Sequence, residues 1–188
     1  MSQNQTSSSS ASVSSYRNTA SAGSQVYFID ASVPGYEALA LSLGENSKVF
    51  VIENTSDAFI QIDRALASLS DPASSVHIYS HGRDGAILLG GQWIDEAALS
   101  QSSEILKSIG ESLTQGADIL LYGCNTAASS LGESFIARMA RLASVDVAAS
   151  SNMTGTGGDW TLEKGTGDIE TTPTRPGEWL GNLDAGDP

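Results

Sequence analysis

The side chains best suited to chemistry in this chain are the thiol of Cys124 and the imidazole of His81. Cys124 is the only cysteine and directly follows an apolar run at residues 117–123, while His81 follows a similar run at residues 76–80. Both runs are typical of buried strands, and an open parallel sheet binds its ligands beyond the carboxyl ends of its strands. An imidazole that accepts the proton of a nearby thiol creates a thiolate nucleophile. We therefore predict that Cys124 and His81 form a nucleophile and its base.

Glycines lie next to both candidate residues, at Gly82 and Gly123. They allow a substrate to approach the backbone closely, and amides there can donate hydrogen bonds to a developing oxyanion. A helix that opens at Ser130 would add a weak positive potential near the thiol. The other histidine, His77, lies inside a predicted strand, so we interpret it as a residue of the sheet. The competing interpretation of Cys124 is a small buried hydrophobic residue without chemistry.

The elements that would position these residues alternate between strands and helices. Apolar runs predict strands at residues 26–30, 48–52, 76–80, 117–123 and 145–149. Helical spacing predicts helices at about 36–43 and at about 103–115. A third helix is predicted from a cap at Ser56 or Asp57 to Leu69, and a fourth begins with a capping box at Ser130. We also expect a small β-hairpin at residues 85–94 and a hairpin or two short strands within residues 154–170.

This order of elements predicts an α/β fold. Repeated β-α units with uninterrupted apolar strands are typical of a mostly parallel sheet with helices on both faces, a three-layer α-β-α sandwich. His81 and Cys124 are separated by one strand–crossover–strand unit with the hairpin inserted. Because such crossovers commonly place consecutive strands side by side, the two side chains are expected at one edge of the sheet.

Both ends of the chain differ from its centre in composition. Residues 1–24 are rich in Ser and predict a disordered leader, and residues 25–170 predict the folded domain. Residues 171–188 are rich in Pro, Gly and Asp and predict a C-terminal loop and linker, in which Trp179 and Leu180 can dock on the domain.

The composition excludes several classes of function. With 22 acidic and 9 basic residues the formal net charge is −13, and no run of Lys or Arg could neutralise phosphates, so we expect no nucleic-acid partner. No stretch approaches the ~18 apolar residues of a membrane span, so we expect no membrane insertion. Residues 1–25 lack the regions of a signal peptide, so an export signal would lie elsewhere in a longer chain. One cysteine excludes an internal disulfide and a cysteine-based zinc cluster.

Other motifs indicate chemistry less strongly. The Gly-rich stretch 155–159 lacks the lysine and spacing of a phosphate loop, and no Gly-x-Ser-x-Gly elbow accompanies Ser80. Asp159, Asp168 and Glu170 carry oxygen ligands that calcium uses, but without the spacing of an EF-hand, so solvated loop carboxylates are the better interpretation. We predict no metal site and no required cofactor, with Ca²⁺ as the one cation to consider.

An apolar strand that ends in His-Gly, followed by a second that ends in Cys, resembles the hallmark of the caspase, gingipain, legumain and separase superfamily (clan CD) of cysteine peptidases. The chain resembles still more closely an uncharacterised bacterial family, domain of unknown function 4347. The resemblance spans about residues 26–170 and is carried by Tyr79-Ser80-His81-Gly82, Ala117-Asp118-Ile119-Leu120-Leu121-Tyr122-Gly123-Cys124-Asn125, Val147-Ala148-Ala149-Ser150 and Gly157-Gly158-Asp159-Trp160.

The resemblance implies a caspase-like sandwich in which Cys124 is the nucleophile and His81 the base or acid. It also implies that the backbone amides of Gly82 and Cys124 hold the oxyanion. In these peptidases, segments after the strand that follows the cysteine line the first specificity pocket, which here points to Ser150, Ser151, Asp159 and Trp160. Members of the bacterial family usually form the N-terminal module of very large surface or secreted proteins, which implies an extracellular or cell-surface location within a larger exported chain.

The chain also departs from these peptidases. Tyr122-Gly123-Cys124-Asn125 replaces the Gln-Ala-Cys form of caspases, and Arg83 is the only basic residue near either candidate. Legumain-like peptidases carry an acidic residue at the position of Tyr122. The substrate preference of these families therefore does not transfer to this chain.

Three functions stay open from the sequence. The first is a cysteine endopeptidase that processes its own parent chain, the nearest substrate at high effective concentration, with Arg17 and Arg175 as candidate cleavage sites. The second is a catalytically silent recognition or assembly module of a large bacterial adhesin. The third is a small-molecule thiol acyltransferase that uses the same two residues.

Overall fold

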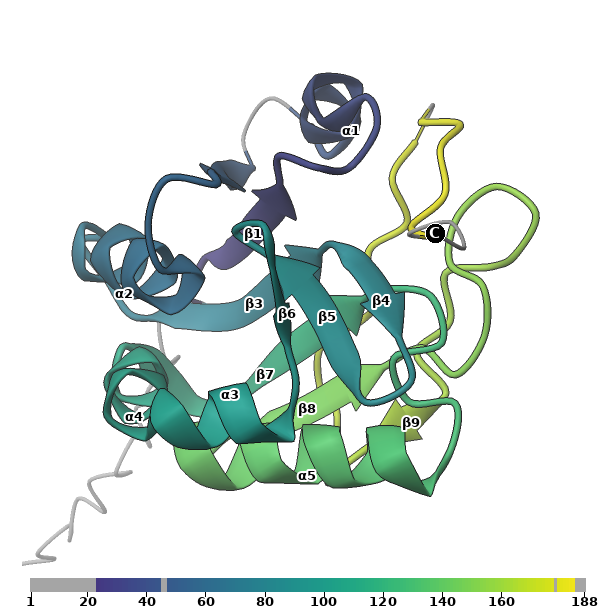
Figure 1. Cartoon of the computed structure of the whole chain (residues 1–188). Helices are drawn as coiled ribbons and strands as arrows, with labels where there is room; N and C mark the ends of the chain where they lie inside the picture. Colours follow the sequence, from purple (N-terminus) through teal and green to yellow (C-terminus); the bar gives the residue numbers. More distant parts are fainter. Residues whose placement is uncertain (1–22, 45–46, 178, 185–188) are drawn as a thin grey trace, which may run out of the picture.

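The computed structural model describes residues 23–44, 47–177 and 179–184 (Figure 1). The predicted leader, apart from its last two residues, and the candidate cleavage site Arg17 lie outside these described residues. The elements in chain order are β1 (Gln25–Asp30), α1 (Tyr36–Ser42), β2 (Lys48–Ile52), α2 (Ala58–Ala67), β3 (Ala73–Tyr79), β4 (His81–Arg83), β5 (Ala86–Leu89), β6 (Gln92–Ile94), α3 (Glu96–Gln101), α4 (Ser103–Glu111), β7 (Leu113–Tyr122), α5 (Ser130–Ala143), β8 (Asp146–Ala149) and β9 (Lys164–Gly165).

The centre of the molecule is a six-stranded sheet in the order β2-β1-β3-β7-β8-β9. All neighbouring strands in it are parallel except β9, which pairs antiparallel with β8 at the edge. This confirms an α/β fold with a mostly parallel sheet. The central strands β1, β3 and β7 are buried on both faces, as expected for strands that lack polar alternation.

The two faces of the sheet are covered differently (Figure 1). Helices α2, α3, α4 and α5 pack on one face, where Val26, Phe28 and Leu121 belong to the larger apolar core. The opposite face carries α1 and residues 179–184, called the C-terminal stretch below. Side chains of both join Tyr27, Ile29 and other alternate strand residues in a second core. We expected a layer of helices on this face. Among the described residues, α1 is the one helix with a buried side chain in the second core.

Several element boundaries differ from the predictions. The predicted helix at 103–115 ends at Glu111, because Leu113 already pairs with Ala73 of β3 and Ser112 terminates the helix. The predicted hairpin at 85–94 is part of a small three-stranded sheet, β4-β5-β6, in which His81–Arg83 is the third strand. Within residues 154–170 the two residues of β9 are the one strand that the structure describes.

The helix caps also refine the predictions. Asp57 caps α2 by accepting hydrogen bonds from the amides of Phe59 and Ile60. Ser129, and not Ser130, caps α5 by accepting from the amide of Leu131 at 3.1 Å.

Candidate active site

The strand pairing brings His81 and Cys124 to the same level of the sheet. Tyr79 of β3 is the register partner of Tyr122 of β7, and the amide of Ser80 donates to the Tyr122 carbonyl at 3.2 Å. His81 and Cys124 each lie two positions further on, beyond the carboxyl ends of these two adjacent strands. Neighbouring strands are about 4.8 Å apart. The expectation that the crossover places these strands side by side is confirmed.

Gly82 lies against the backbone of the cysteine loop. A Cβ atom at Gly82 would come 2.7 Å from the Cys124 carbonyl oxygen and 2.7 Å from the Gly123 carbonyl carbon. Real side chains do not tolerate such contacts, so only glycine allows the two loops to meet. The close approach brings the amide of Gly82, a predicted oxyanion donor, beside the candidate nucleophile.

The His81 ring is anchored through one of its two nitrogens. Its side chain is 7% exposed, and Nε2 lies 3.3 Å from the carbonyl oxygen of Ser32. Because a carbonyl only accepts, Nε2 carries the hydrogen and Nδ1 is left as an acceptor. Nδ1 is buried and has no hydrogen-bond partner among the residues that the structure describes. Nδ1 is therefore free of protein partners in this part of the chain and available to a donor that reaches it.

Asp30 positions the Ser32 carbonyl and was not singled out from the sequence. Its carboxylate is buried at the end of β1 and accepts hydrogen bonds from the amide and hydroxyl of Ser32. It also accepts from the amide of Gly90 at 2.6 Å, in the turn between β5 and β6. The signal in the sequence is a lone carboxylate that ends an otherwise apolar strand.

Cys124 is a buried, neutral thiol in this structure. Its side chain is fully buried, and Sγ accepts a hydrogen bond from the amide of Thr154 at 3.2 Å. Burial raises the pKa of the Cys124 thiol, and the nearby Asp184 carboxylate raises it further, although the Thr154 amide acts in the opposite direction. A nucleophilic role of this thiol would therefore require a base, because its surroundings do not favour the thiolate.

The amino end of α5 does not supply the expected positive potential to this thiol. The Asp84 carboxylate accepts hydrogen bonds there from the amides of Ser129, at 3.0 Å, and Gly132, at 3.1 Å. It also accepts from the Ser129 hydroxyl. A carboxylate at this position offsets the helix dipole.

Three of the four residues predicted to bind substrate support the loop after β8. Ser150 is buried and donates to the Asn152 carbonyl, while the amide and hydroxyl of Ser151 both donate to Glu163. Asp159 accepts from the amide of Thr161 at 2.7 Å, and this hydrogen bond lowers the pKa of the Asp159 carboxyl.

The fourth predicted residue, Trp160, packs with Tyr79, Tyr122 and Trp179 in a cluster called the aromatic wall below. The cluster belongs to the same core as Cys124. The ring centroid of Trp160 lies 6.1 Å from that of Tyr79, 6.2 Å from that of Tyr122 and 5.9 Å from that of Trp179. Trp160 and Asp159 also line a hollow of about 440 Å³. The docking expected of Trp179 occurs, since it is 8% exposed, whereas Leu180 is 83% exposed.

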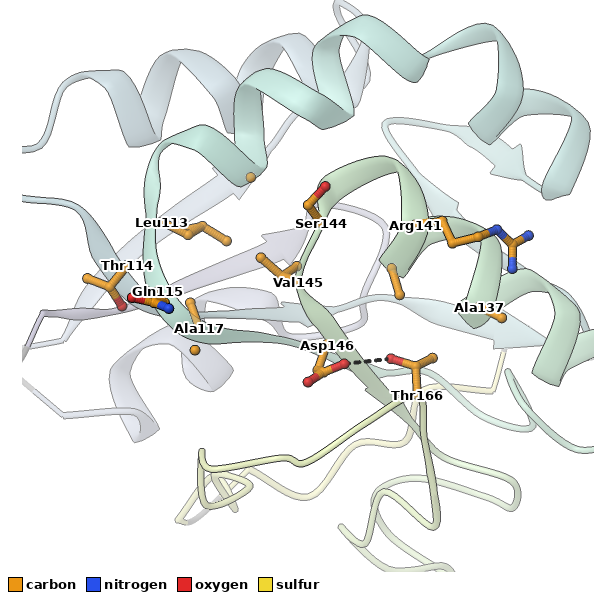
Figure 2. Close-up of a pocket in the computed structure, with 13 residues that line it drawn as sticks. Leu113, Thr114, Gln115, Ala117, Ala137, Arg141, Ser144, Val145, Asp146 and Thr166 are labelled. Carbon is orange, nitrogen blue, oxygen red and sulfur yellow. Dashed lines mark hydrogen bonds between the residues drawn. The ribbon is translucent and has the colours of Figure 1, made fainter.

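A larger hollow, of about 590 Å³, lies elsewhere (Figure 2). Its lining includes Leu113 and Ala117 at the start of β7 and Asp146 at the start of β8, where Thr166 donates to the Asp146 carboxylate. These are the amino ends of the parallel strands, opposite to Cys124. The hollow brings no thiol or imidazole together, so its size does not make it the candidate site.

Neither a metal cluster nor a membrane span is found in the described part of the chain. No group of three or more His, Cys, Asp or Glu side chains is arranged there to hold a metal ion. No helix within the described ranges is long and apolar enough to cross a membrane.

Comparison with known proteins identifies the family. The model of the family described as "Domain of unknown function (DUF4347)" matches residues 26–179, which include His81, Cys124 and the aromatic wall. The chain belongs to this family. No curated protein and no solved structure matches the chain. The family description assigns no activity.

Proposed function

We propose that this domain is a caspase-like cysteine endopeptidase with Cys124 as nucleophile and His81 as base. The observation that carries the proposal is the unpartnered, buried Nδ1 of a histidine that follows β3, the strand adjacent to the β7 strand that leads to the thiol. The Gly82 amide supports it as an oxyanion donor, and the Cys124 amide is the second donor that the resemblance implies. The sheet order with helices α2–α5 on one face is compatible with a caspase-like arrangement.

In this mechanism each group has one task. His81 Nδ1 accepts the proton of the thiol while its Nε2–H stays on the Ser32 carbonyl, and the thiolate attacks the substrate carbonyl carbon. The proton then passes to the leaving amine as the carbon–nitrogen bond breaks. Water releases the acyl group from Cys124 with His81 again accepting a proton, which restores the thiol.

The cellular context belongs to the same proposal. We infer that the domain acts outside the cell or on the cell surface, as part of a larger exported protein whose own chain is a substrate. With a formal net charge of −13 it is a poor partner for nucleic acid. Ca²⁺ would act on the larger protein, because catalysis by Cys124 and His81 requires no metal.

The competing function, a catalytically silent recognition or assembly module, is favoured by one observation. The Cys124 thiol is fully buried and burial raises its pKa, as expected for a cysteine that only packs. The His81 ring favours the peptidase instead, because its anchored Nε2 leaves Nδ1 free to accept the proton of a thiol.

The test is incubation of the purified chain, and of a longer parent segment, with and without Ca²⁺. We expect discrete fragments that Cys124→Ala and His81→Gln abolish and that the matched variant of the structural histidine, His77→Gln, leaves in place. A peptide electrophile should label Cys124 in the wild type. Absence of fragments in every condition, together with absence of labelling, would overturn the peptidase and leave the silent module.

A further inference from the structure

Residues 181–184 of the C-terminal stretch pair through their main chain with the loop after β8 and with Gly82. The amide of Leu183 donates to the carbonyl of Thr154 at 3.0 Å, and the amide of Thr156 donates to the carbonyl of Gly181 at 2.8 Å. Alternate residues of the stretch thus pair with alternate residues of the loop after β8. This is how a protein binds an extended peptide through its main chain, whatever its side chains.

The carbonyl of Leu183 is at the predicted oxyanion position. The amide of Gly82 donates to it at 3.4 Å, and Gly82 forms a parallel bridge with Asp184. Cys124 is near the same bond, because the Thr154 carbonyl that accepts from the Leu183 amide also accepts from the Cys124 thiol at 3.6 Å. The peptide bond between Leu183 and Asp184 therefore lies beside the nucleophile, with its oxygen toward the donor.

The side chain before this bond is buried in an apolar pocket. Leu183 is 0% exposed and belongs to the second core together with Cys124, Tyr79, Tyr122 and Trp179. Leu180, on the same stretch, is 83% exposed, so the stretch is anchored by one leucine and not by general apolarity.

The loop that receives the stretch is shaped for a passing backbone. Gly155 has a φ of 105°, and a Cβ atom there would come 2.6 Å from the Gly181 carbonyl oxygen. Gly155 also forms an antiparallel bridge with Asn182. Glycine is required here by the peptide and not only by the turn.

The other candidate cleavage site among the described residues, Arg175, is held away from Gly82 and Cys124. The residue before it, Thr174, has its amide on the Tyr122 hydroxyl at 2.7 Å, and its carbonyl accepts from the Tyr79 hydroxyl at 2.9 Å. These hydrogen bonds hold that part of the chain on the tyrosines of the sheet, and none of them brings its peptide bonds to Gly82 or Cys124.

We propose that the Leu183–Asp184 bond is cleaved in cis by Cys124 and His81, and that the first specificity pocket takes an aliphatic side chain of the leucine type. This inference rests on the proposed peptidase function. The thiol proton moves to His81 Nδ1 as Sγ bonds to the Leu183 carbonyl carbon. The carbon–nitrogen bond to Asp184 then breaks as His81 returns the proton to the Asp184 nitrogen. Water hydrolyses the thioester, which leaves a carboxylate at Leu183 and the free thiol.

The experiment follows the intact mass of the purified 188-residue chain over time at neutral pH. We expect a product that ends at Leu183 and a released peptide of residues 184–188, both absent in Cys124→Ala. Leu183→Arg should slow the cleavage by at least about 100-fold, since a cation cannot enter the apolar pocket. Leu180→Arg is the matched control on the exposed leucine and should cleave at the wild-type rate.

The outcomes separate this inference from the proposed function. Cys124-dependent cleavage at another bond would overturn the assignment of Leu183–Asp184 and leave the peptidase standing. An intact chain whose Cys124 is labelled faster by a leucyl than by an arginyl peptide electrophile would overturn cleavage in cis and retain the pocket. An intact chain without labelling would overturn both. Equal effects of Leu183→Arg and Leu180→Arg would overturn the pocket.

Discussion

The buried His77 should make the stability of this fold sensitive to acid. His77 is 0% exposed, with one ring nitrogen 3.1 Å from the Ser75 hydroxyl and the other 3.1 Å from the Tyr122 hydroxyl. Its ring also stacks on Tyr27 at a centroid distance of 4.6 Å. Burial lowers the pKa of His77 from 6.5 to about 4. His77 therefore stays neutral at physiological pH and acts as a hydrogen-bonded part of the sheet.

The lowered pKa makes the stability of the fold depend on pH. Because the unfolded chain binds a proton at this site near pH 6.5 and the folded chain only near pH 4, acid favours the unfolded state. The contribution of neutral, buried His77 to the free energy of unfolding is fully present above pH 6.5. It is lost as the pH falls towards 4. Over that interval it amounts to about 3 kcal/mol.

The assay is the free energy of unfolding in denaturant at pH 7 and pH 4.5, for the wild type and for His77→Gln. Between these pH values the wild type should lose about 2–3 kcal/mol more than the variant, because other titrating groups are common to both. NMR of the two histidine side chains provides an independent measurement of the pKa. Equal losses in both proteins, or a His77 resonance that titrates above pH 6, would refute the reasoning.

Three further predictions concern the site and its support. Gly82→Ala should lower the rate of Cys124-dependent cleavage by ~10²–10³-fold, because the added Cβ displaces the oxyanion donor; unchanged kinetics would remove Gly82 from the site. Asp84→Ala should lower the free energy of unfolding by about 1–2 kcal/mol, measured in urea, because the start of α5 loses its carboxylate partner; an unchanged midpoint would contradict this. Leu183→Ser should speed alkylation of Cys124 by iodoacetamide at pH 7 by at least about tenfold, as loosening the C-terminal stretch lowers the pKa of the thiol; an equal rate would show that this stretch does not protect it.

Much of the fold could be predicted because its signals are local. Each long apolar run became a strand, and Asp57 caps α2 as the sequence indicated. The predicted end of the helix at 103–115 was wrong because its last residues belong to a strand that pairs with another strand. Leu113 continued a helical pattern but pairs with Ala73, because the main-chain hydrogen bonds of the sheet outweigh a final turn of helix.

The candidate site could be predicted only in part, for a similar reason. The position of Cys124 and His81 at strand ends is visible in the residues themselves. The residues that support them were missed: Asp30 acts through Ser32, and Thr154 offers only its backbone, which leaves no mark on residue type. Ser151 and Asp159 were selected by position along the chain, but their polar groups are taken up by the loop itself.

The sequence by itself thus determined that the chain folds as an α/β domain with a lone thiol and an imidazole at the ends of two core strands. Apolar periodicity and strand ends are properties of neighbouring residues, so they can be read without a structure. Only the tertiary structure decided which nitrogen of His81 is free, since that depends on a carbonyl beyond β1. It also decided that Leu183 joins the apolar core that contains the thiol, because residues distant along the chain meet only when the sheet has formed.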